Sequence, residues 1–163
     1  MGLIKLSFCM PTYNRAGFIG QTLDSIISQA TDEVEIIIFD GGSTDNTEQV
    51  VSTYLEKFKQ IRYYRQEFKG GIDRDLNKTI EKARGEYCWL MPDDDILKPG
   101  ALHTILNKIN NNYSLIIVNS EMRNTDLSEV LEEKRLCFEN DKVYKPNDQS
   151  SLLIETISHL SYT

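Results

Sequence analysis

The sequence contains few cysteines and no long hydrophobic run. Uninterrupted apolar stretches, such as residues 36–39 and 115–118, are about four residues long, whereas a membrane-spanning helix needs about 18. The first ten residues also lack an apolar stretch long enough for the core of a signal peptide. Cys9, Cys88 and Cys137 are odd in number and widely spaced, which argues against a disulfide framework or a zinc site. We therefore expect a cytoplasmic protein with buried thiols.

Positive charge is also scarce. Eighteen Lys and Arg residues stand against 25 Asp and Glu residues, which gives a formal net charge of −7. Proteins that bind DNA or RNA need a basic surface for the phosphates, so nucleic acid is not an expected partner. The P-loop motif, G-x-x-x-x-G-K followed by Ser or Thr, is absent. The remaining composition, 40% hydrophobic and 26% charged over 163 residues, is that of a globular domain.

Short apolar runs alternate along the chain with segments of helical periodicity. The runs predict strands and the periodic segments predict helices. Strands are expected at residues 3–9, 34–39, 61–65, 87–91 and 115–118, and helices at 16–29, 46–58, 73–84 and 99–109. This alternation is typical of an α/β fold with a largely parallel sheet and helices on both faces. After Asn119 the pattern is irregular, and we expect a hairpin within 126–143 and a helix at 150–160.

Four polar loops follow the first four predicted strands. They comprise residues 11–15, 40–45, 69–74 and 92–95. Open parallel sheets bind ligands beyond the carboxyl ends of their strands, where these loops meet. The topology therefore brings Arg15, Asp40, Asp73 and three consecutive aspartates to one edge of the sheet.

The three consecutive aspartates, residues 93–95, repel one another unless a proton or a cation intervenes. Mg²⁺ and Mn²⁺ prefer oxygen ligands and commonly hold substrate phosphates through one or two carboxylates. The same residues would also suit a solvated acidic turn before the helix that we expect to begin at Pro99. The motif alone leaves both interpretations open.

Two further loops have a structural and a functional interpretation. Residues 40–45 form an ordinary strand-to-helix turn with Asp45 as a helix cap, or Asp40 accepts a hydrogen bond from a nucleobase N–H. In residues 11–15, Asn14 caps a helix, or Thr12 and Arg15 face a ribose or a phosphate.

Taken together, these motifs resemble those of the family-2 inverting glycosyltransferases. The segments that carry the resemblance are residues 11–15, 40–45, 83–87, 93–94 and 97–101. Residues 70–75 and 87–90 are similar to the abequosyltransferase-like branch of that family. The resemblance implies a Rossmann-like nucleotide-sugar-binding domain of the glycosyltransferase A type over residues 1–118. Residues 119–163 would then begin an acceptor-side region that this sequence leaves incomplete.

The resemblance also implies roles for individual residues. It assigns donor binding to Pro11, Thr12, Tyr13, Arg15, Asp40, Gly42, Ser43, Gly71, Asp73 and Asp93. It assigns coordination of Mn²⁺ or Mg²⁺ to Asp94. The family often has an aspartate where Pro92 stands here, which leaves Asp94 as the expected metal ligand. The catalytic base is expected beyond Thr163.

The function implied is metal-dependent, inverting transfer from a nucleoside-diphosphate sugar to a hydroxyl of a saccharide or lipid-linked acceptor. Synthesis of bacterial surface polysaccharide is the expected setting, with peripheral contact at the inner face of the membrane and self-association of the chain. The alternative is a non-catalytic module that binds a nucleotide sugar and needs a partner.

Overall fold

The computed structural model describes residues 2–136, 138 and 140–145. The chain divides into two compact units, Met1–Tyr113 and Ser114–Thr163. The domain boundary expected after residue 118 stays a prediction. No helix in the described part of the chain is long and apolar enough to cross a membrane.

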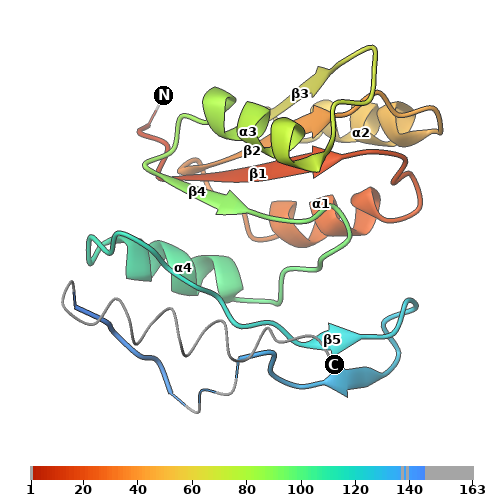
Figure 1. Ribbon diagram of the computed structural model, residues 1–163. Coiled ribbons are helices and arrows are strands. Elements are labelled where there is room, and N and C mark those ends of the chain that lie inside the picture. The colour runs from red at the N-terminus through yellow and green to blue at the C-terminus, as the bar shows by residue number, and fades with distance from the viewer. Residues whose placement is uncertain (1, 137, 139, 146–163) are drawn as a thin grey trace. The chain divides into compact units, whose positions relative to one another are not determined.

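The first unit is built on a four-stranded parallel sheet (Figure 1). Its strands are β1 (Leu6–Thr12), β2 (Val34–Asp40), β3 (Ile61–Arg65) and β4 (Tyr87–Leu90). Their order across the sheet is β3-β2-β1-β4, and every neighbouring pair is parallel. The predicted α/β class with a parallel sheet is therefore confirmed.

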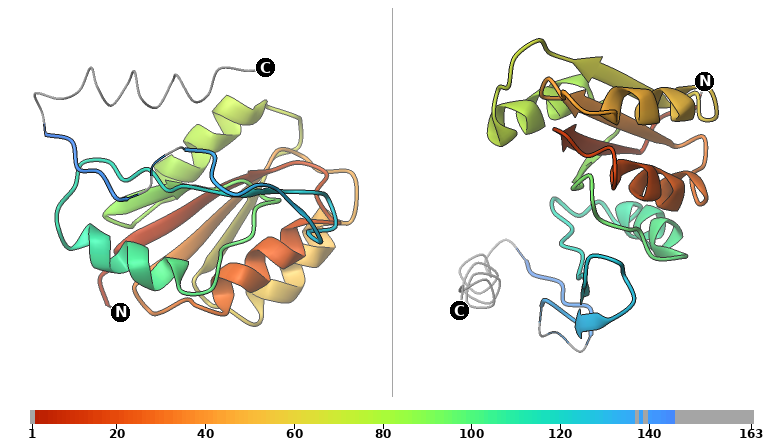
Figure 2. Two further views of the ribbon diagram at one scale, coloured as in Figure 1. Left: turned by 90° about the horizontal axis from the view of Figure 1, so that it is seen from below. Right: turned by 90° about the vertical axis from the view of Figure 1, so that its right-hand side faces the viewer.

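Helices cover both faces of this sheet. They are α1 (Ile19–Ile27), α2 (Thr47–Leu55), α3 (Ile72–Lys82) and α4 (Ala101–Ile109). Helix α3 packs on β1 and β2, and Figure 2 shows it on the face opposite α1 and α2. The chain adds β2 and β3 on one side of β1 and then crosses to β4 on the other side. The strand order thus reverses between β1 and β4, where sheets of this kind bind ligands.

The core lies along the two central strands. All seven residues of β1 are buried, and six of the seven residues of β2 are buried as well. Parallel strands covered on both faces have nearly continuous apolar sequences, because neither face meets water. The sheet contributes Phe8 and Ile36 to the core, and α1 contributes Leu23 and Ile26.

The edge strand β4 is covered less completely. Trp89 stacks on Phe8 with ring centroids 5.1 Å apart, whereas Cys88 and Leu90 point to the other face and are exposed. The expectation of a buried Cys88 is therefore wrong, because only one face of this strand is covered by the described residues. Cys9 on β1 is buried as expected, and burial raises the pKa of its thiol to about 12. Cys137 lies outside the described residues.

Two predicted elements of the chain differ from the structure. Residues 115–118 form no strand, and Leu115, Ile117 and Val118 are exposed. A run of four apolar residues is typical of a buried strand. Residues 115–118 differ because none of the described strands pairs with them. The fourth helix begins at Ala101 rather than Pro99, because Gly100 takes a left-handed conformation with φ of 80°.

In the second unit, β5 (Met122–Arg123) and β6 (Val130–Glu132) form an antiparallel hairpin. The Asp126 carboxylate accepts hydrogen bonds from the backbone N–H and the hydroxyl of Ser128, which stabilise the connecting turn. The hairpin expected within 126–143 is present, but it begins earlier in the chain. The helix expected at 150–160 lies outside the described residues.

A buried polar network lies near the amino-terminal ends of the strands, away from their carboxyl ends. Glu35 on β2 is 3% exposed. Its Oε1 accepts hydrogen bonds from the Ser7 hydroxyl at 2.7 Å and from the Arg84 backbone N–H at 2.6 Å. Its Oε2 pairs with the Arg62 guanidinium at 3.0 Å. One carboxylate of β2 thus bonds to β1, to β3 and to the segment that leads into β4.

Candidate functional site

A cavity of about 230 Å³ opens at the carboxyl end of β1. Its walls come from the loop after β1, the loop that leads into α3, and the loop after β4. The lining residues are Pro11, Thr12, Tyr13, Arg15, Lys69, Gly71, Ile72, Asp75 and Asp93. Six of them, all except Lys69, Ile72 and Asp75, belong to the set that the sequence assigns to donor binding.

The loop after β1 is fixed by bonds to the loop after β2. Asn14 adopts a left-handed conformation with φ of 54°, and its side-chain oxygen accepts a hydrogen bond from the Thr44 backbone N–H at 2.7 Å. The Asn14 backbone N–H donates to the Ser43 hydroxyl at 2.9 Å. The capping role expected for Asn14 is wrong, because the N-cap of α1 is Phe18, and Asn14 links the two loops instead. These bonds hold Tyr13 and Arg15 at the mouth of the cavity.

Asp45 reinforces the same contact between the two loops. One of its carboxylate oxygens accepts from the Thr47 backbone N–H at 3.0 Å at the start of α2, and the other accepts from the Ala16 backbone N–H at 3.1 Å. The N-cap of α2 is Asn46 rather than the expected Asp45, and Asp45, one residue earlier, bonds both the first residue of α2 and the loop after β1.

The variant Asp45→Ala should lower the free energy of unfolding by about 1–2 kcal/mol, because two backbone N–H groups lose their acceptor and a hydrogen bond contributes about 0.5–1.5 kcal/mol. Asp45 does not line the cavity, so nucleotide affinity should stay within about twofold of the parent value. Urea denaturation and calorimetric titration measure the two quantities. Asp32→Ala, at an exposed turn, is the control and should change stability by less than about 0.5 kcal/mol. A loss of affinity without a loss of stability would contradict the structural role.

Asp40 lies at the end of β2 and is fully buried. Its Oδ1 accepts the Ser43 backbone N–H at 2.7 Å, and its Oδ2 accepts the Tyr63 hydroxyl at 2.6 Å. Burial and the neighbouring Asp40 charge raise the pKa of Tyr63, which keeps the phenol protonated as a donor. Asp40 does not line the cavity, and its predicted contact with a nucleobase stays a prediction.

Gly42 and Ser43, from the same loop, also lie outside the cavity lining. Gly42 has φ of 87° and packs against the backbone of residues 66–68. Ser43 is 4% exposed. The structure therefore shows these two residues building the loop, and their predicted donor contacts stay predictions.

Asp93 and Arg15 form an ion pair across the cavity mouth, with Arg15 Nε 3.4 Å from Asp93 Oδ1. The side chain of Asp93 is 11% exposed, and burial raises the pKa of this carboxyl, an effect that Thr12 and Arg15 partly oppose. The backbone oxygen of Asp93 accepts a hydrogen bond from the Thr22 hydroxyl on α1 at 3.0 Å. This bond fixes the loop after β4 next to the end of β1.

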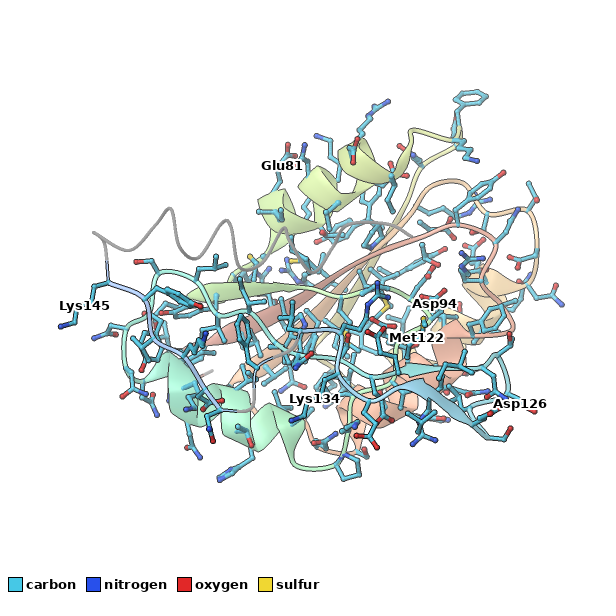
Figure 3. All side chains as sticks on the ribbon, turned by 60° about the horizontal axis from the view of Figure 1, so that its bottom comes forward. Glu81, Asp94, Met122, Asp126, Lys134 and Lys145 are labelled. Atoms are coloured by element: carbon cyan, nitrogen blue, oxygen red, sulfur yellow. The ribbon has the colours of Figure 1, made fainter. Side chains whose placement is uncertain are left out.

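Asp94 follows in the same loop and is exposed (Figure 3). No three His, Cys, Asp or Glu side chains of the described residues converge to hold a metal ion. Mg²⁺ and Mn²⁺ need no such cluster when substrate phosphates supply the other oxygens, because one or two carboxylates then suffice. The two adjacent carboxylates of Asp93 and Asp94 fit that kind of site.

Sequence reasoning gave no ligand role to Ile72 and Asp75, which line the cavity, whereas it named Lys69, together with Arg15 and Arg74, as a side chain that could bond the phosphates. It chose Asp73, which is exposed on the first turn of α3 and outside the lining. The buried residues of α3 are Asp75 and Thr79, one turn apart, whereas Ile80 is 41% exposed. Asp75 and Thr79 are four residues apart, which would place them on one face of a helix. The apolar residues Leu76 and Ile80 are also four apart, and their spacing predicts a buried face one position away instead.

Known proteins share this sequence pattern. The family model described as Glycosyl transferase family 2 matches residues 7–158. GalNAc(5)-diNAcBac-PP-undecaprenol beta-1,3-glucosyltransferase from Campylobacter jejuni is 34% identical over 71% of this chain and 38% of its own length. Abequosyltransferase RfbV from Salmonella typhimurium is 30% identical over 83% of this chain and 42% of its own length. The chain thus spans about two fifths of the length of these curated relatives.

Solved structures share the fold. TarS from S. aureus in complex with UDP-GlcNAc matches with a TM-score of 0.62 and 29% identity, over 66% of this chain and 32% of that chain. The mannosyltransferase PcManGT from Pyrobaculum calidifontis, in complex with GDP-Man and Mn²⁺, matches with a TM-score of 0.60 and 24% identity. That match covers 74% of this chain and 36% of PcManGT, and it bears on the fold alone.

Proposed function

The chain belongs to glycosyl transferase family 2, and on that basis we propose that its cavity binds a nucleoside-diphosphate sugar for transfer of the sugar. The acceptor would be a hydroxyl of a saccharide or a lipid-linked saccharide, and the setting would be synthesis of bacterial surface polysaccharide. The Campylobacter jejuni relative is named for a lipid-linked saccharide, GalNAc(5)-diNAcBac-PP-undecaprenol, and the Salmonella typhimurium relative is named an abequosyltransferase.

The position of the cavity is the observation that carries the proposal. It lies at the carboxyl end of β1, beside the point where the strand order reverses. Two cationic side chains, Arg15 and Lys69, line it in a chain whose net charge is −7. Charge-assisted hydrogen bonds from such groups are the usual means of holding a diphosphate. Lys69 is oriented by the Tyr13 ring, with its Nζ 4.5 Å from the ring centroid.

We assign the divalent cation, Mn²⁺ or Mg²⁺, to Asp94, with Asp93 beside it. The cation would neutralise charge on the departing nucleoside diphosphate as a Lewis acid. Asp93 keeps Arg15 at the cavity mouth, where the guanidinium can reach a phosphate oxygen. An inverting transfer also needs a base to take the proton of the acceptor hydroxyl. We assign that role to no residue of the described chain.

The test is a calorimetric titration of the chain with nucleoside diphosphates in the presence of Mn²⁺. We expect saturable binding, and we expect Lys69→Gln to weaken it about tenfold or more, since a hydrogen bond to a charged group contributes about 1.5–3 kcal/mol. Lys78→Gln, on the exposed side of α3, is the matched control and should leave the affinity unchanged.

A glycosyl-transfer assay with a saccharide acceptor then separates the two functions considered. Release of nucleoside diphosphate with sugar appearing on the acceptor supports transfer by this chain. Binding without release favours a module that only binds the donor. Absence of nucleotide binding by the parent chain contradicts the proposed function in both forms.

A further inference from the structure

The carboxylate of Asp75 on α3 is buried and lines the cavity, and it forms no salt bridge with the described residues. Asp75 is 4% exposed and lines the cavity. Its Oδ1 accepts a hydrogen bond from Gln66 Nε2 at 2.9 Å, and among the described residues no group donates to its Oδ2. Oδ1 is therefore held by a hydrogen bond from Gln66, and Oδ2 is able to accept a hydrogen bond from a ligand.

Two glycines make the space that this carboxylate occupies. A Cβ added at Gly41 would lie 2.6 Å from Asp75 Oδ2, and one added at Gly70 would lie 2.7 Å from Asp75 Oδ1. The glycines come from different loops, one after β2 and one before α3. A side chain at either position would displace the carboxylate, so both loops are shaped to hold a buried acceptor at this point of the cavity wall.

Asp40 and Asp75 differ in what their oxygens can still do. Both oxygens of Asp40 are held by the protein, one by Ser43 and one by Tyr63. Burial raises the pKa of Asp75, and the Asp40 charge adds to that rise, while Gln66 and Arg74 oppose it. Asp75 therefore differs from Asp40 in that its Oδ2 accepts no hydrogen bond from the described residues.

The charge distribution along the cavity decides which part of a nucleotide meets Asp75. The diphosphate carries negative charge, so it belongs with Arg15 and Lys69, and a buried carboxylate would repel it. The nucleoside is then the part of the ligand left to meet Asp75. The Asp75 carboxylate can accept a hydrogen bond from an amino group of the base, and it repels a carbonyl oxygen of the base. Cytosine, adenine and guanine carry an exocyclic amino group, whereas uracil and thymine present carbonyl oxygens on both sides of one N–H.

We propose that Asp75 determines the nucleobase specificity of the cavity by accepting a hydrogen bond from a base amino group. The pocket then prefers diphosphates of cytidine, adenosine or guanosine over those of uridine and thymidine. This inference rests on the proposed function, because it assumes that the cavity is the site of the nucleotide.

The experiment compares CDP, ADP, GDP, UDP and dTDP by calorimetric titration of the full chain in Mn²⁺. We expect the best amino-bearing nucleotide to bind about tenfold or more tightly than UDP, the size of discrimination that one good base contact gives. Asp75→Asn keeps the shape but can donate as well as accept. It should reduce that preference to about threefold or less. Glu81→Gln makes the same chemical change on an exposed part of α3 and should preserve the preference (Figure 3).

The outcomes separate this inference from the function on which it rests. A parent chain that binds UDP as tightly as the other four nucleotides overturns the specificity role of Asp75 and leaves the proposed function intact. A parent that binds no nucleotide overturns both. An equal loss for all five nucleotides in Asp75→Asn points to a ribose contact and also overturns the inference. The nucleotide series on the parent decides the matter even if the variant does not fold.

Discussion

Replacement of Glu35 by Leu is expected to lower the free energy of unfolding by about 3–5 kcal/mol, the usual effect of breaking a buried ion pair from one side. The substitution removes the carboxylate that pairs with the Arg62 guanidinium, and it leaves the Ser7 hydroxyl and the Arg84 backbone N–H without the Glu35 acceptor. Domains of this size have about 5–15 kcal/mol of stability in total, so most of it could be lost. Urea denaturation followed by circular dichroism measures the change.

Glu33→Leu supplies the matched control for that measurement. Glu33 pairs with Lys5 at 2.7 Å, and both side chains are about a third or more exposed to solvent, at 43% and 31%. An exposed pair of this kind contributes about 0–1 kcal/mol. The double variant Glu35→Leu with Arg62→Met should recover part of the loss, since it removes the unpaired charge as well. Equal, small effects of Glu35→Leu and Glu33→Leu would contradict a buried network.

The parallel sheet was predictable because its central strands are buried on both faces. The sequence of β2 is nearly continuous in apolar residues, and its short length and β-branched composition favour a strand over a buried helix. The same reasoning failed for residues 115–118, which have an equally apolar composition but no described partner strand. Strand formation depends on hydrogen bonds to a neighbour, and a local pattern does not reveal whether that neighbour exists.

The candidate site was predictable in its location but only partly in its residues. Loop positions followed from the ends of the strands, and Thr12, Arg15 and Asp93 do line the cavity, while their contacts with a donor stay predictions. The orientation of α3 did not follow, because Asp73 and Asp75 are both polar residues of its first turns. Asp75 is the one that points inward, into space that Gly41 and Gly70 leave open. Gly41 is far from α3 in the sequence and Gly70 lies before it, so the pattern of α3 alone does not reveal this space.

Asp40 shows a related limit. A carboxylate at the end of a strand can accept hydrogen bonds from a ligand or from its own loop. Both roles need an aspartate at the same position, so the sequence does not distinguish them. Here the Ser43 backbone N–H and the Tyr63 hydroxyl occupy its two oxygens. Tyr63 lies on β3, and only the pairing of β2 with β3 brings its hydroxyl within reach of Asp40.

The variant Asp94→Asn is expected to weaken Mn²⁺-dependent binding of a nucleoside diphosphate by about 100-fold. A Lewis-acid contact to a phosphate oxygen contributes several kcal/mol, and about 2.7 kcal/mol corresponds to that factor. An amide is a neutral and much weaker ligand for a hard cation than a carboxylate. The fold should be unaffected, because Asp94 is exposed in the loop after β4. Titration in Mn²⁺ measures the affinity, and a thermal melt checks the fold.

Two comparisons make the role of Asp94 in metal binding specific. The parent chain treated with a chelator should bind as weakly as Asp94→Asn in Mn²⁺, because both lack the bound cation. Asp32→Asn removes one negative charge from an exposed turn outside the cavity lining and should keep the affinity of the parent. Asp93 would remain in the variant, paired with Arg15. If Asp94→Asn binds as tightly as the parent in Mn²⁺, the cation is held elsewhere, and the adjacent Asp93 becomes the first residue to test.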